Sequence, residues 1–279
     1  MHREFKLVAG VPTMLRLPSL FDLPDPFACA DLVLEVDRAA VDVFVGSSRR
    51  VPRDSLLRLA RGVGVEIGPG PRPQVHNSRT TQVTYVEEMP AERWLEMYKD
   101  DVDAGAWDRC GYKLGKAHDL PVADGSLDFV FSSHVLEHLW NPLGHFDHWR
   151  RKLKPGGLVL VVVPAADGTK DFMLAPTSSE QLAEEHRSGR FDVPLSSYQR
   201  WVREHRFLGD QDALARQRFA ERYSIHVHVY DWVTITNLLR HCVARHGYAS
   251  FRIQYKRNSK DMIFALKADG AKSEREAGA

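Results

Sequence analysis

The sequence predicts an α/β fold built on a mostly parallel β-sheet, and three observations lead to this class. Short apolar runs alternate with helical stretches from residue 62 to residue 164, which is the order that βαβ units produce. The run at 158–163 is apolar at every position, as a strand buried on both faces of a parallel sheet requires. Two runs near the C-terminus, 251–255 and 262–267, flank a polar segment and predict a hairpin that completes a seven-stranded sheet.

The individual elements follow from hydrophobic periodicity and from the turn residues between them. A short helix is expected after Pro52, and the prolines before it interrupt a segment with a β-like patch at 41–45. The strands before the hairpin are expected at 63–67, 83–86, 111–116, 127–132 and 158–163. The longer helices are expected at 134–139, 142–153, 178–187, 196–206, 210–221 and 230–245.

These elements divide the chain into four parts. An N-terminal extension covers 1–60, and a core is formed by 61–165 together with 225–268. Residues 166–224 form a helical cap inserted after the fifth strand, since the segment is too long for a plain loop. The tail at 269–279 is small and polar, so it is expected to be disordered.

The composition is that of a globular protein and disfavours several classes. Hydrophobic residues make up 43% and charged residues 27% of the 279-residue chain, so it is not wholly disordered. Lys and Arg number 38 against 37 Asp and Glu, which disfavours a dedicated nucleic-acid partner or a polybasic membrane anchor. Three dispersed cysteines, without a signal peptide or a membrane-length apolar run, predict a soluble protein of the cytoplasm.

The first chemical signal is the turn after the strand at 63–67. Glu66 stands near the strand end, and Gly68 and Gly70 follow it, so the backbone can approach a ligand closely. A dinucleotide site calls for a third glycine where this chain has Arg72, so a nucleoside without phosphates fits better. An ordinary βα turn would give the same short pattern.

The second signal is an acid at the end of the next strand. Glu87 follows the run at 83–86 and lies 21 residues after Glu66. An acid at this place in a doubly wound sheet can accept hydrogen bonds from ribose hydroxyls. Glu88 is the rival for this role, and a solvated strand end would look the same.

A longer pattern covers residues 117–139 and 153–157. It reads AHDLPVADGSLDFVFSSHVLEHL, and LKPGG comes before the strand at 158–163. In order and spacing these segments and the acid-x-Gly-x-Gly turn resemble the class I S-adenosylmethionine-dependent methyltransferases, in their broad small-molecule subgroup. The resemblance covers 62–165 and 225–267. It implies a Rossmann-like fold with S-adenosylmethionine (SAM) as cofactor, and its motifs specify the superfamily without specifying the substrate.

The resemblance also implies a set of cofactor contacts. The glycine turn would cradle the amino-acid part and ribose, the acid of the second strand would hold the ribose hydroxyls, and residues after the third strand would border the adenine. Residues at the end of the fourth strand would lie beside the methionine moiety. The expected contacts are Glu66, Gly68, Gly70, Glu87, Ala117, His118, Ser132, Ser133 and His134. Lys116 stands where many relatives carry an acid beside the adenine, so the adenine contacts would differ.

Histidines supply the candidate catalytic groups. Eleven of the thirteen lie between positions 118 and 246. His138 and His134 are the first candidates for a catalytic base, because imidazole titrates near neutrality. His226 and His228 are further candidates. The alternative is that His138 packs or caps within the helix, which is the commonest role of this histidine in relatives with a VLEH segment.

The alternative role for the same residues is metal binding. His134-x-x-Glu137-His138 has the spacing of a zinc-peptidase motif, although its place after the fourth strand speaks against a peptidase. Some RNA 2′-O-methyltransferases hold a divalent ion with an acid-x-x-Glu-His cluster and a distant histidine, which here would be His226 or His228. No residue is assigned as a metal ligand on this basis.

The inserted segment carries eight arginines between positions 187 and 222 and no lysine, with aromatic residues among them. Arginine suits carboxylate or phosphate recognition, yet neighbouring acids offer these arginines helical partners. We expect a SAM-dependent methyltransferase acting on a small-molecule or glycan-type acceptor, on oxygen because histidines cluster. The alternatives are a degenerate methyltransferase-fold partner protein and a metal-assisted O-methyltransferase of RNA or of a small molecule. The acceptor's identity and the oligomeric state are not indicated.

Overall fold

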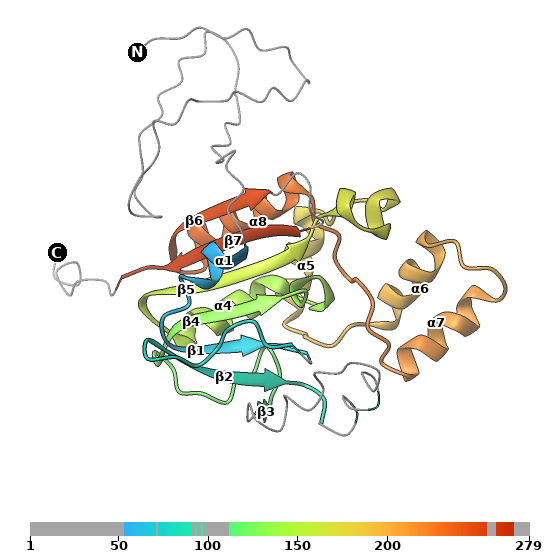
Figure 1. Ribbon diagram of the computed structural model, residues 1–279. Helices are drawn as coiled ribbons and strands as arrows, with labels where there is room; N and C mark the ends of the chain where they lie inside the picture. Colours follow the sequence, from blue (N-terminus) through green and yellow to red (C-terminus); the bar gives the residue numbers. More distant parts are fainter. Residues whose placement is uncertain are drawn as a thin grey trace, which may run out of the picture. The chain divides into compact units, whose positions relative to one another are not determined.

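The described strands form one seven-stranded sheet in the order β3-β2-β1-β4-β5-β7-β6 (Figure 1). The computed structural model describes residues 53–70, 72–90, 93, 96, 112–255 and 261–270. The expected extension up to residue 52, its β-like patch and the tail from residue 271 lie outside these residues. The division of the chain into extension, core, cap and tail therefore stays a prediction.

The sheet is parallel except at one strand, as expected for a Rossmann-like α/β fold. The strands are β1 (Gly62–Ile67), β2 (Thr81–Glu87), β3 (Tyr112–Leu114), β4 (Leu127–Ser133), β5 (Leu153–Pro164), β6 (Tyr248–Tyr255) and β7 (Asp261–Ala268). β7 pairs antiparallel with both β5 and β6, which gives the predicted C-terminal hairpin. β5 begins before the predicted run, because Leu153 pairs with Leu127 at the start of β4 before the register shifts and pairing resumes at Leu158.

The helices α4 and α8 pack against the sheet in the core, and further helices follow β5. The α-helices are α1 (Arg53–Leu57), α4 (Pro142–Lys152), α5 (Ser179–Ser188), α6 (Leu195–Glu204), α7 (Gln211–Ala220) and α8 (Trp232–Arg245). The single turns are η2 (Leu136–His138), η3 (Ala166–Gly168) and η4 (Lys170–Met173). α4 begins at Pro142 because the Asn141 side chain accepts the Gly144 N–H, and Asp231 begins α8 by accepting the Thr234 N–H.

The core lies between the sheet and the helices α4 and α8. Val159 and Val161 of β5 are fully buried, and they belong to one cluster with Phe146, Trp149 and Leu239 of the covering helices. Burial of such side chains is the dominant stabilising term of a domain of this kind. The core therefore fixes β1, β4 and β5, whose ends carry the predicted site.

The predicted helix at 134–139 is wrong. His134 has a φ of 55°, in the left-handed region, and only the 3-10 turn η2 follows it. An α-helix cannot pass through a left-handed residue. His134 and His138 therefore do not share a helix face, although both remain near Glu137.

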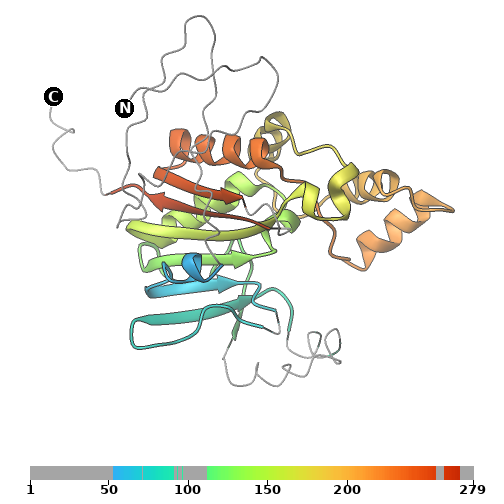
Figure 2. The same cartoon turned by 45° about the horizontal axis from the view of Figure 1, so that its top comes forward.

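The helices α6 and α7 form a small layer of their own. α6 and α7 lie beyond the carboxyl ends of β1, β2 and β4 in both ribbon views (Figures 1 and 2). They enclose a second cluster that includes Tyr198, Trp201, Ala215 and Ile225. Part of the aromatic set in the insertion is therefore core.

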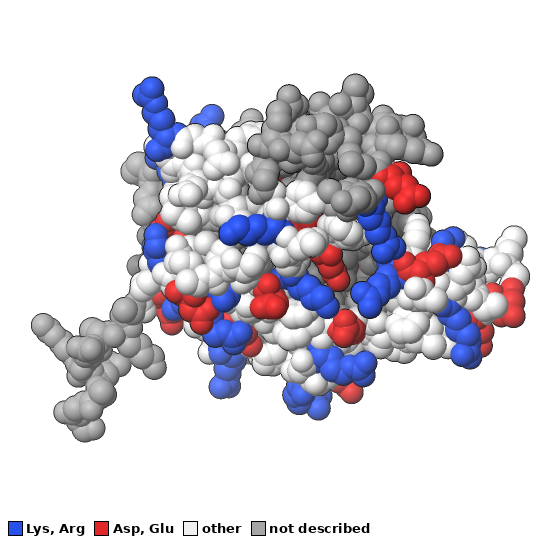
Figure 3. Space-filling view, turned by 90° about the horizontal axis from the view of Figure 1, so that it is seen from below, with Lys and Arg blue, Asp and Glu red and all other residues white. Residues whose placement is uncertain are grey.

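The surface carries both charge signs. Figure 3 shows Lys and Arg side chains interspersed with Asp and Glu on the face in view. Among the helices of the described residues, none is long and apolar enough to cross a membrane.

Candidate functional site

The strand ends that the sequence singled out meet at one edge of the sheet. Ile67 at the end of β1 pairs with Val86 of β2 on one side and with Ser132 of β4 on the other. Glu87 at the end of β2 pairs with Leu114 of β3. Ligands of open α/β sheets bind beyond the carboxyl ends of the strands, so this edge is the candidate site.

The turn after β1 is built from glycines in the left-handed region. Gly68 has a φ of 60° and Gly70 a φ of 58°. A Cβ placed on Gly68 would lie 2.7 Å from Cγ2 of Val135. The turn is therefore packed against the segment that follows β4, and a side chain at Gly68 would have to displace it.

The Glu66 side chain fixes the loop after this turn through hydrogen bonds to its backbone. Its side chain is buried and accepts hydrogen bonds from the backbone N–H groups of Gln74 (2.9 and 3.1 Å) and Val75 (2.9 Å). Burial raises the pKa of the Glu66 carboxyl to about 7, against the lowering effect of these two N–H groups. These contacts favour a role in shaping the loop over direct contact with a ligand.

Glu87 is buried beside the same turn. Its Oε1 accepts the Gly70 N–H at 3.1 Å, and its backbone oxygen accepts the Gly115 N–H at 2.9 Å. Glu87 therefore links the glycine turn to the end of β3. In doubly wound sheets an acid at the end of the second strand can accept hydrogen bonds from ribose hydroxyls.

Ala117 and His118, the predicted adenine contacts, follow β3 and contact side chains of other elements. The Ala117 carbonyl accepts the Trp149 indole N–H at 2.7 Å. The His118 ring stacks on Phe191, with ring centroids 4.2 Å apart and 8° between the planes. Burial, and next the charge of Lys116, lower the pKa of His118. Phe191 was not singled out for this contact, since it lies 73 residues later in the insertion.

Two serine hydroxyls mark the end of β4. Ser132 Oγ and Ser133 Oγ are buried, and neither has a hydrogen-bond partner within the described part of the chain. Buried hydroxyls usually have a partner, because leaving one unpaired is costly. We therefore expect these two hydroxyls to hydrogen-bond a polar group of a bound ligand.

His134 follows them and lies between two acids. Its Nε2 is 3.1 Å from Asp261 Oδ1, and its Nδ1 is 3.5 Å from Glu137 Oε1. Asp261, then Glu137, raise the pKa of His134 to about 9. At neutral pH this imidazole is a cation, so it is poorly suited to act as a base.

His138 is held differently. Its Nδ1 is 2.8 Å from the Ile225 carbonyl oxygen and 3.1 Å from Ser224 Oγ, while its Nε2 is 3.7 Å from Glu137 Oε1. Burial lowers the pKa of His138. The neutral ring has its Nε2 lone pair free, because a carbonyl can only accept a hydrogen bond and so takes the Nδ1 proton.

His226 joins this group from the segment between α7 and α8, whereas His228 does not. The His226 ring meets the His138 ring edge-on, with centroids 5.0 Å apart, and its Nδ1 lies 2.5 Å from Asp171 Oδ2. His228 is fully buried and lies 3.2 Å from Glu185 Oε2, on the side of the core.

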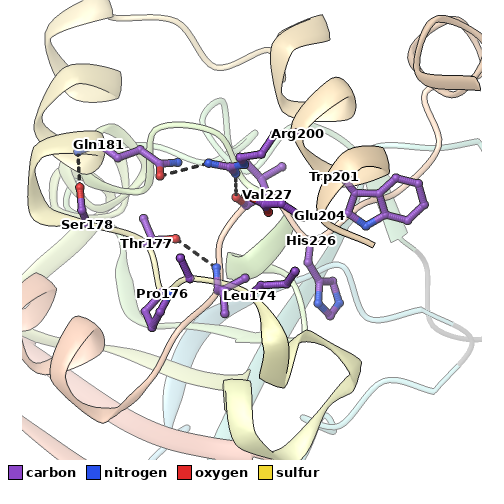
Figure 4. Close-up of a pocket in the computed structure, with 12 residues that line it drawn as sticks. Leu174, Pro176, Thr177, Ser178, Gln181, Arg200, Trp201, Glu204, His226 and Val227 are labelled. Atoms are coloured by element: carbon purple, nitrogen blue, oxygen red, sulfur yellow. Dashed lines mark hydrogen bonds between the residues drawn. The ribbon is translucent and has the colours of Figure 1, made fainter. Parts of the chain in front are cut away.

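A pocket of about 130 Å³ opens beside His226, between α5, α6 and the segment before α8 (Figure 4). Arg200 crosses it and donates to the Val227 carbonyl oxygen (2.5 Å) and to Gln181 Oε1 (3.2 Å). His226 lies at the opposite end from Ser178 and Gln181 in Figure 4. The Arg200 guanidinium is therefore used within the protein, although its partners are a glutamine and a backbone carbonyl rather than the neighbouring acids that the sequence suggested.

The acids that orient the histidines escaped the sequence analysis. Asp171 lies in η4, and Asp261 opens β7, which starts at this edge because it runs antiparallel to β5. Neither stands in a motif of spaced residues. An aspartate at the first position of the last strand was the only local signal.

Comparison with known proteins identifies the domain. The family model described as a methyltransferase domain matches residues 62–161. An uncharacterized 37.1 kDa protein of a Streptomyces fradiae transposon is 26% identical over 147 residues, which are 52% of this chain and 41% of that protein. A Mycolicibacterium smegmatis protein named as a probable SAM-dependent methyltransferase is 38% identical over 56 residues, 20% of this chain and 22% of that one. The chain thus aligns with less than half the length of these curated relatives.

Among solved structures, one described as a possible histamine N-methyltransferase from Thermotoga maritima is 15% identical. It covers 79% of this chain and 91% of its own, with a TM-score of 0.43. The family match, the motif order and the sheet topology together establish residues 62–161 as a class I SAM-dependent methyltransferase domain.

Proposed function

We propose that the protein transfers a methyl group from SAM to an oxygen atom of a small-molecule or glycan-type acceptor. One observation carries the proposal. The glycine turn, the two buried serine hydroxyls and the His138 imidazole with a free Nε2 all lie at one edge of a methyltransferase sheet. The first two features suit a cofactor, and the third suits a hydroxyl acceptor.

The residues of this edge fit SAM. Gly68 lets the turn keep its left-handed backbone close to Val135, where a Cβ would lie 2.7 Å from Cγ2. The unpaired hydroxyls of Ser132 and Ser133 can hydrogen-bond the zwitterionic amino-acid group of SAM. The His134 imidazole, whose pKa is raised, can act as a cation for the carboxylate of that group. We propose that Glu87 holds the ribose hydroxyls and that Ala117 and His118 border the adenine.

When bound, SAM supplies a methyl group on a positively charged sulfur. The protein has to hold the acceptor in line with that methyl group and to take the proton of a hydroxyl. We propose that His138 Nε2 accepts this proton, because the Ile225 carbonyl fixes the Nδ1 proton on the far side of the ring. His134 is proposed as the cation that helps to orient Glu137.

The pocket beside His226 favours a small acceptor. Its volume of about 130 Å³ suits a compact polar group rather than a long polymer segment. Thr177, Gln181 and Glu204 line it together with apolar side chains such as Leu174 and Trp201. A sugar or a hydroxylated ring offers the mixed polar and apolar surface that such a lining would contact.

The test is methyl transfer to a panel of sugars, glycosides and phenols, followed as S-adenosylhomocysteine release. Substitution of His138 by Asn should lower the rate roughly 10²–10⁴-fold, the usual contribution of a general base, and leave S-adenosylhomocysteine affinity unchanged. Transfer to amines only, or an unaltered rate in H138N, would refute oxygen methylation with His138 as base.

A further inference from the structure

We propose that Glu137, His138 and His226 bind a divalent transition-metal ion beside the acceptor. This inference rests on the proposed function, because the site lies at the same edge of the sheet. One ligand atom from each of the three residues lies within 4.8 Å of the other two. The residues come from η2 and from the segment before α8, so the topology rather than local sequence brings them together.

The buried carboxylate of Glu137 is the strongest single observation. The residue is only 1% exposed, and neither carboxylate oxygen has a hydrogen-bond partner among the residues described. Two imidazole nitrogens lie near its Oε1, His134 Nδ1 at 3.5 Å and His138 Nε2 at 3.7 Å. Burying a carboxylate is costly unless cations and hydrogen bonds compensate it. His134 does so only in part, because 3.5 Å is longer than an ordinary hydrogen bond. An ion among Glu137, His138 and His226 would complete the compensation.

His138 presents the right atom to this carboxylate. Its Nδ1 lies 2.8 Å from the Ile225 carbonyl oxygen, which accepts the ring proton. The lone pair is then on Nε2, the atom that faces Glu137. Metal-binding histidines characteristically donate their other N–H to a backbone carbonyl or a carboxylate in this way.

His226 repeats the arrangement with a carboxylate. Its Nδ1 lies 2.5 Å from Oδ2 of Asp171, a residue only 3% exposed. Asp171 Oδ2 can only accept a hydrogen bond, so Nδ1 donates to it and the Nε2 lone pair is left for a ligand. The His138 and His226 rings meet at 72° with centroids 5.0 Å apart. Two imidazoles are thus held in fixed orientations by separate oxygen acceptors.

The donor set indicates the kind of ion. Two imidazole nitrogens and one carboxylate oxygen suit Zn²⁺, Co²⁺ or Fe²⁺ better than Mg²⁺ or Ca²⁺, which prefer oxygen. Three protein ligands also leave a position open, as in catalytic metal sites.

An acceptor hydroxyl in that open position would ionise more easily. Its proton would pass to solvent water. The oxygen would then form a bond to the methyl carbon, while the electron pair of the broken carbon–sulfur bond stays on sulfur. With the ion bound, His138 acts as a ligand rather than as the base.

A second cluster in the chain provides a matched control. Asp147, His186 and His246 also lie within 4.8 Å of one another. There, however, each Asp147 oxygen already has an imidazole nitrogen, at 2.8 Å from His186 and 2.6 Å from His246. Hydrogen bonds use both carboxylate oxygens, so this cluster is expected to link α4, α5 and α8 rather than to bind an ion.

The experiment is a titration of chelator-treated full-length protein with Co²⁺, followed by visible absorbance, with Zn²⁺ and Mg²⁺ as competitors. We expect one equivalent of Co²⁺ with a d–d band that Zn²⁺ displaces and Mg²⁺ does not. His226→Asn and Glu137→Gln should abolish the band, and Asp171→Asn should weaken binding about 10–100-fold. His186→Asn should leave the titration unchanged. Thermal melts show which variants are folded, and the conservative His226→Asn keeps the test open if Glu137→Gln does not fold.

No band in the wild-type protein, or a band that survives His226→Asn and is lost in His186→Asn, would overturn the metal site. Calorimetry with S-adenosylhomocysteine on the same samples separates this result from the proposed function. Cofactor binding without a Co²⁺ band would refute only the metal site. A Co²⁺ band without cofactor binding would refute the methyltransferase activity instead.

Discussion

Gly68→Ala tests whether the turn after β1 has to be bare backbone. Gly68 and Gly125 have almost the same left-handed φ, 60° and 62°, but they differ in surroundings. A Cβ on Gly68 would lie 2.7 Å from Val135 Cγ2, whereas a Cβ on Gly125 would have no atom within 4 Å. Gly125→Ala therefore measures backbone strain alone, and the difference between the two variants measures the packing of the turn.

The expected magnitudes follow from these two contributions. A left-handed alanine costs about 1–2 kcal/mol, which both variants should show. Overpacking adds about 1–3 kcal/mol at Gly68 only, so Gly68→Ala should cost roughly 2–5 kcal/mol in the free energy of unfolding. Val135→Ala in the same chain should recover much of the excess, since it removes the atom that the new Cβ meets.

Urea unfolding gives the stabilities, and calorimetry with S-adenosylhomocysteine gives the affinities. Gly68→Ala should also weaken cofactor binding, whereas Gly125→Ala should not. Equal losses of stability in the two variants, together with unchanged affinity in Gly68→Ala, would show that the turn neither packs closely nor contacts the cofactor.

Three further predictions concern other parts of the core. Glu87→Ala should weaken S-adenosylhomocysteine binding about tenfold or more, because a hydrogen bond to a charged group contributes about 1.5–3 kcal/mol; unchanged calorimetric affinity would refute the ribose assignment. Burial lowers the pKa of His148, whose Nε2 accepts the Leu120 N–H, to about 4. Between about pH 4 and pH 6.5 unfolding therefore takes up a proton at His148, so the contribution of this residue to stability should fall from pH 6.5 toward pH 4 by at most about 1.4 kcal/mol per unit. His148→Gln, which keeps an acceptor, should flatten that slope in urea melts, and an identical slope would contradict the argument. Glu185→Ala should cost about 1–3 kcal/mol in thermal and urea unfolding, because it removes the acceptor of the buried Asn141 N–H and the carboxylate 3.2 Å from His228 Nε2; an unchanged free energy of unfolding would mean that these contacts do not stabilise the fold.

The sheet could be predicted because its signals are local. Apolar runs bounded by turn residues indicate strands whatever their neighbours, and β1, β2, β4 and β5 all contain the runs from which they were predicted. The glycine turn was also predictable, since positive φ at Gly68 and Gly70 restricts the residue type. These parts depend on the chain's own backbone preferences.

The features that the sequence did not predict depend on contacts between residues far apart in the chain. The segment at 134–139 has the composition of a helix, yet His134 adopts a left-handed conformation beside Asp261, which lies 127 residues away. Asp171 orients His226 from a separate segment of the insertion, and Phe191 covers His118 from another. Nothing near any of these residues in the sequence indicates its partner. They could be found only after the antiparallel β7 and the helices after β5 were placed at the same edge.

Calorimetric titration of the purified chain with SAM and with S-adenosylhomocysteine is the most direct test of the methyltransferase function, with a thermal melt beside it. We expect saturable binding of both ligands at one site. A ligand at 100 times its dissociation constant should stabilise the protein by about 2.7 kcal/mol, a shift that the melt resolves. A folded sample that is free of copurified cofactor and binds neither ligand would contradict the function and would favour a degenerate methyltransferase-fold protein.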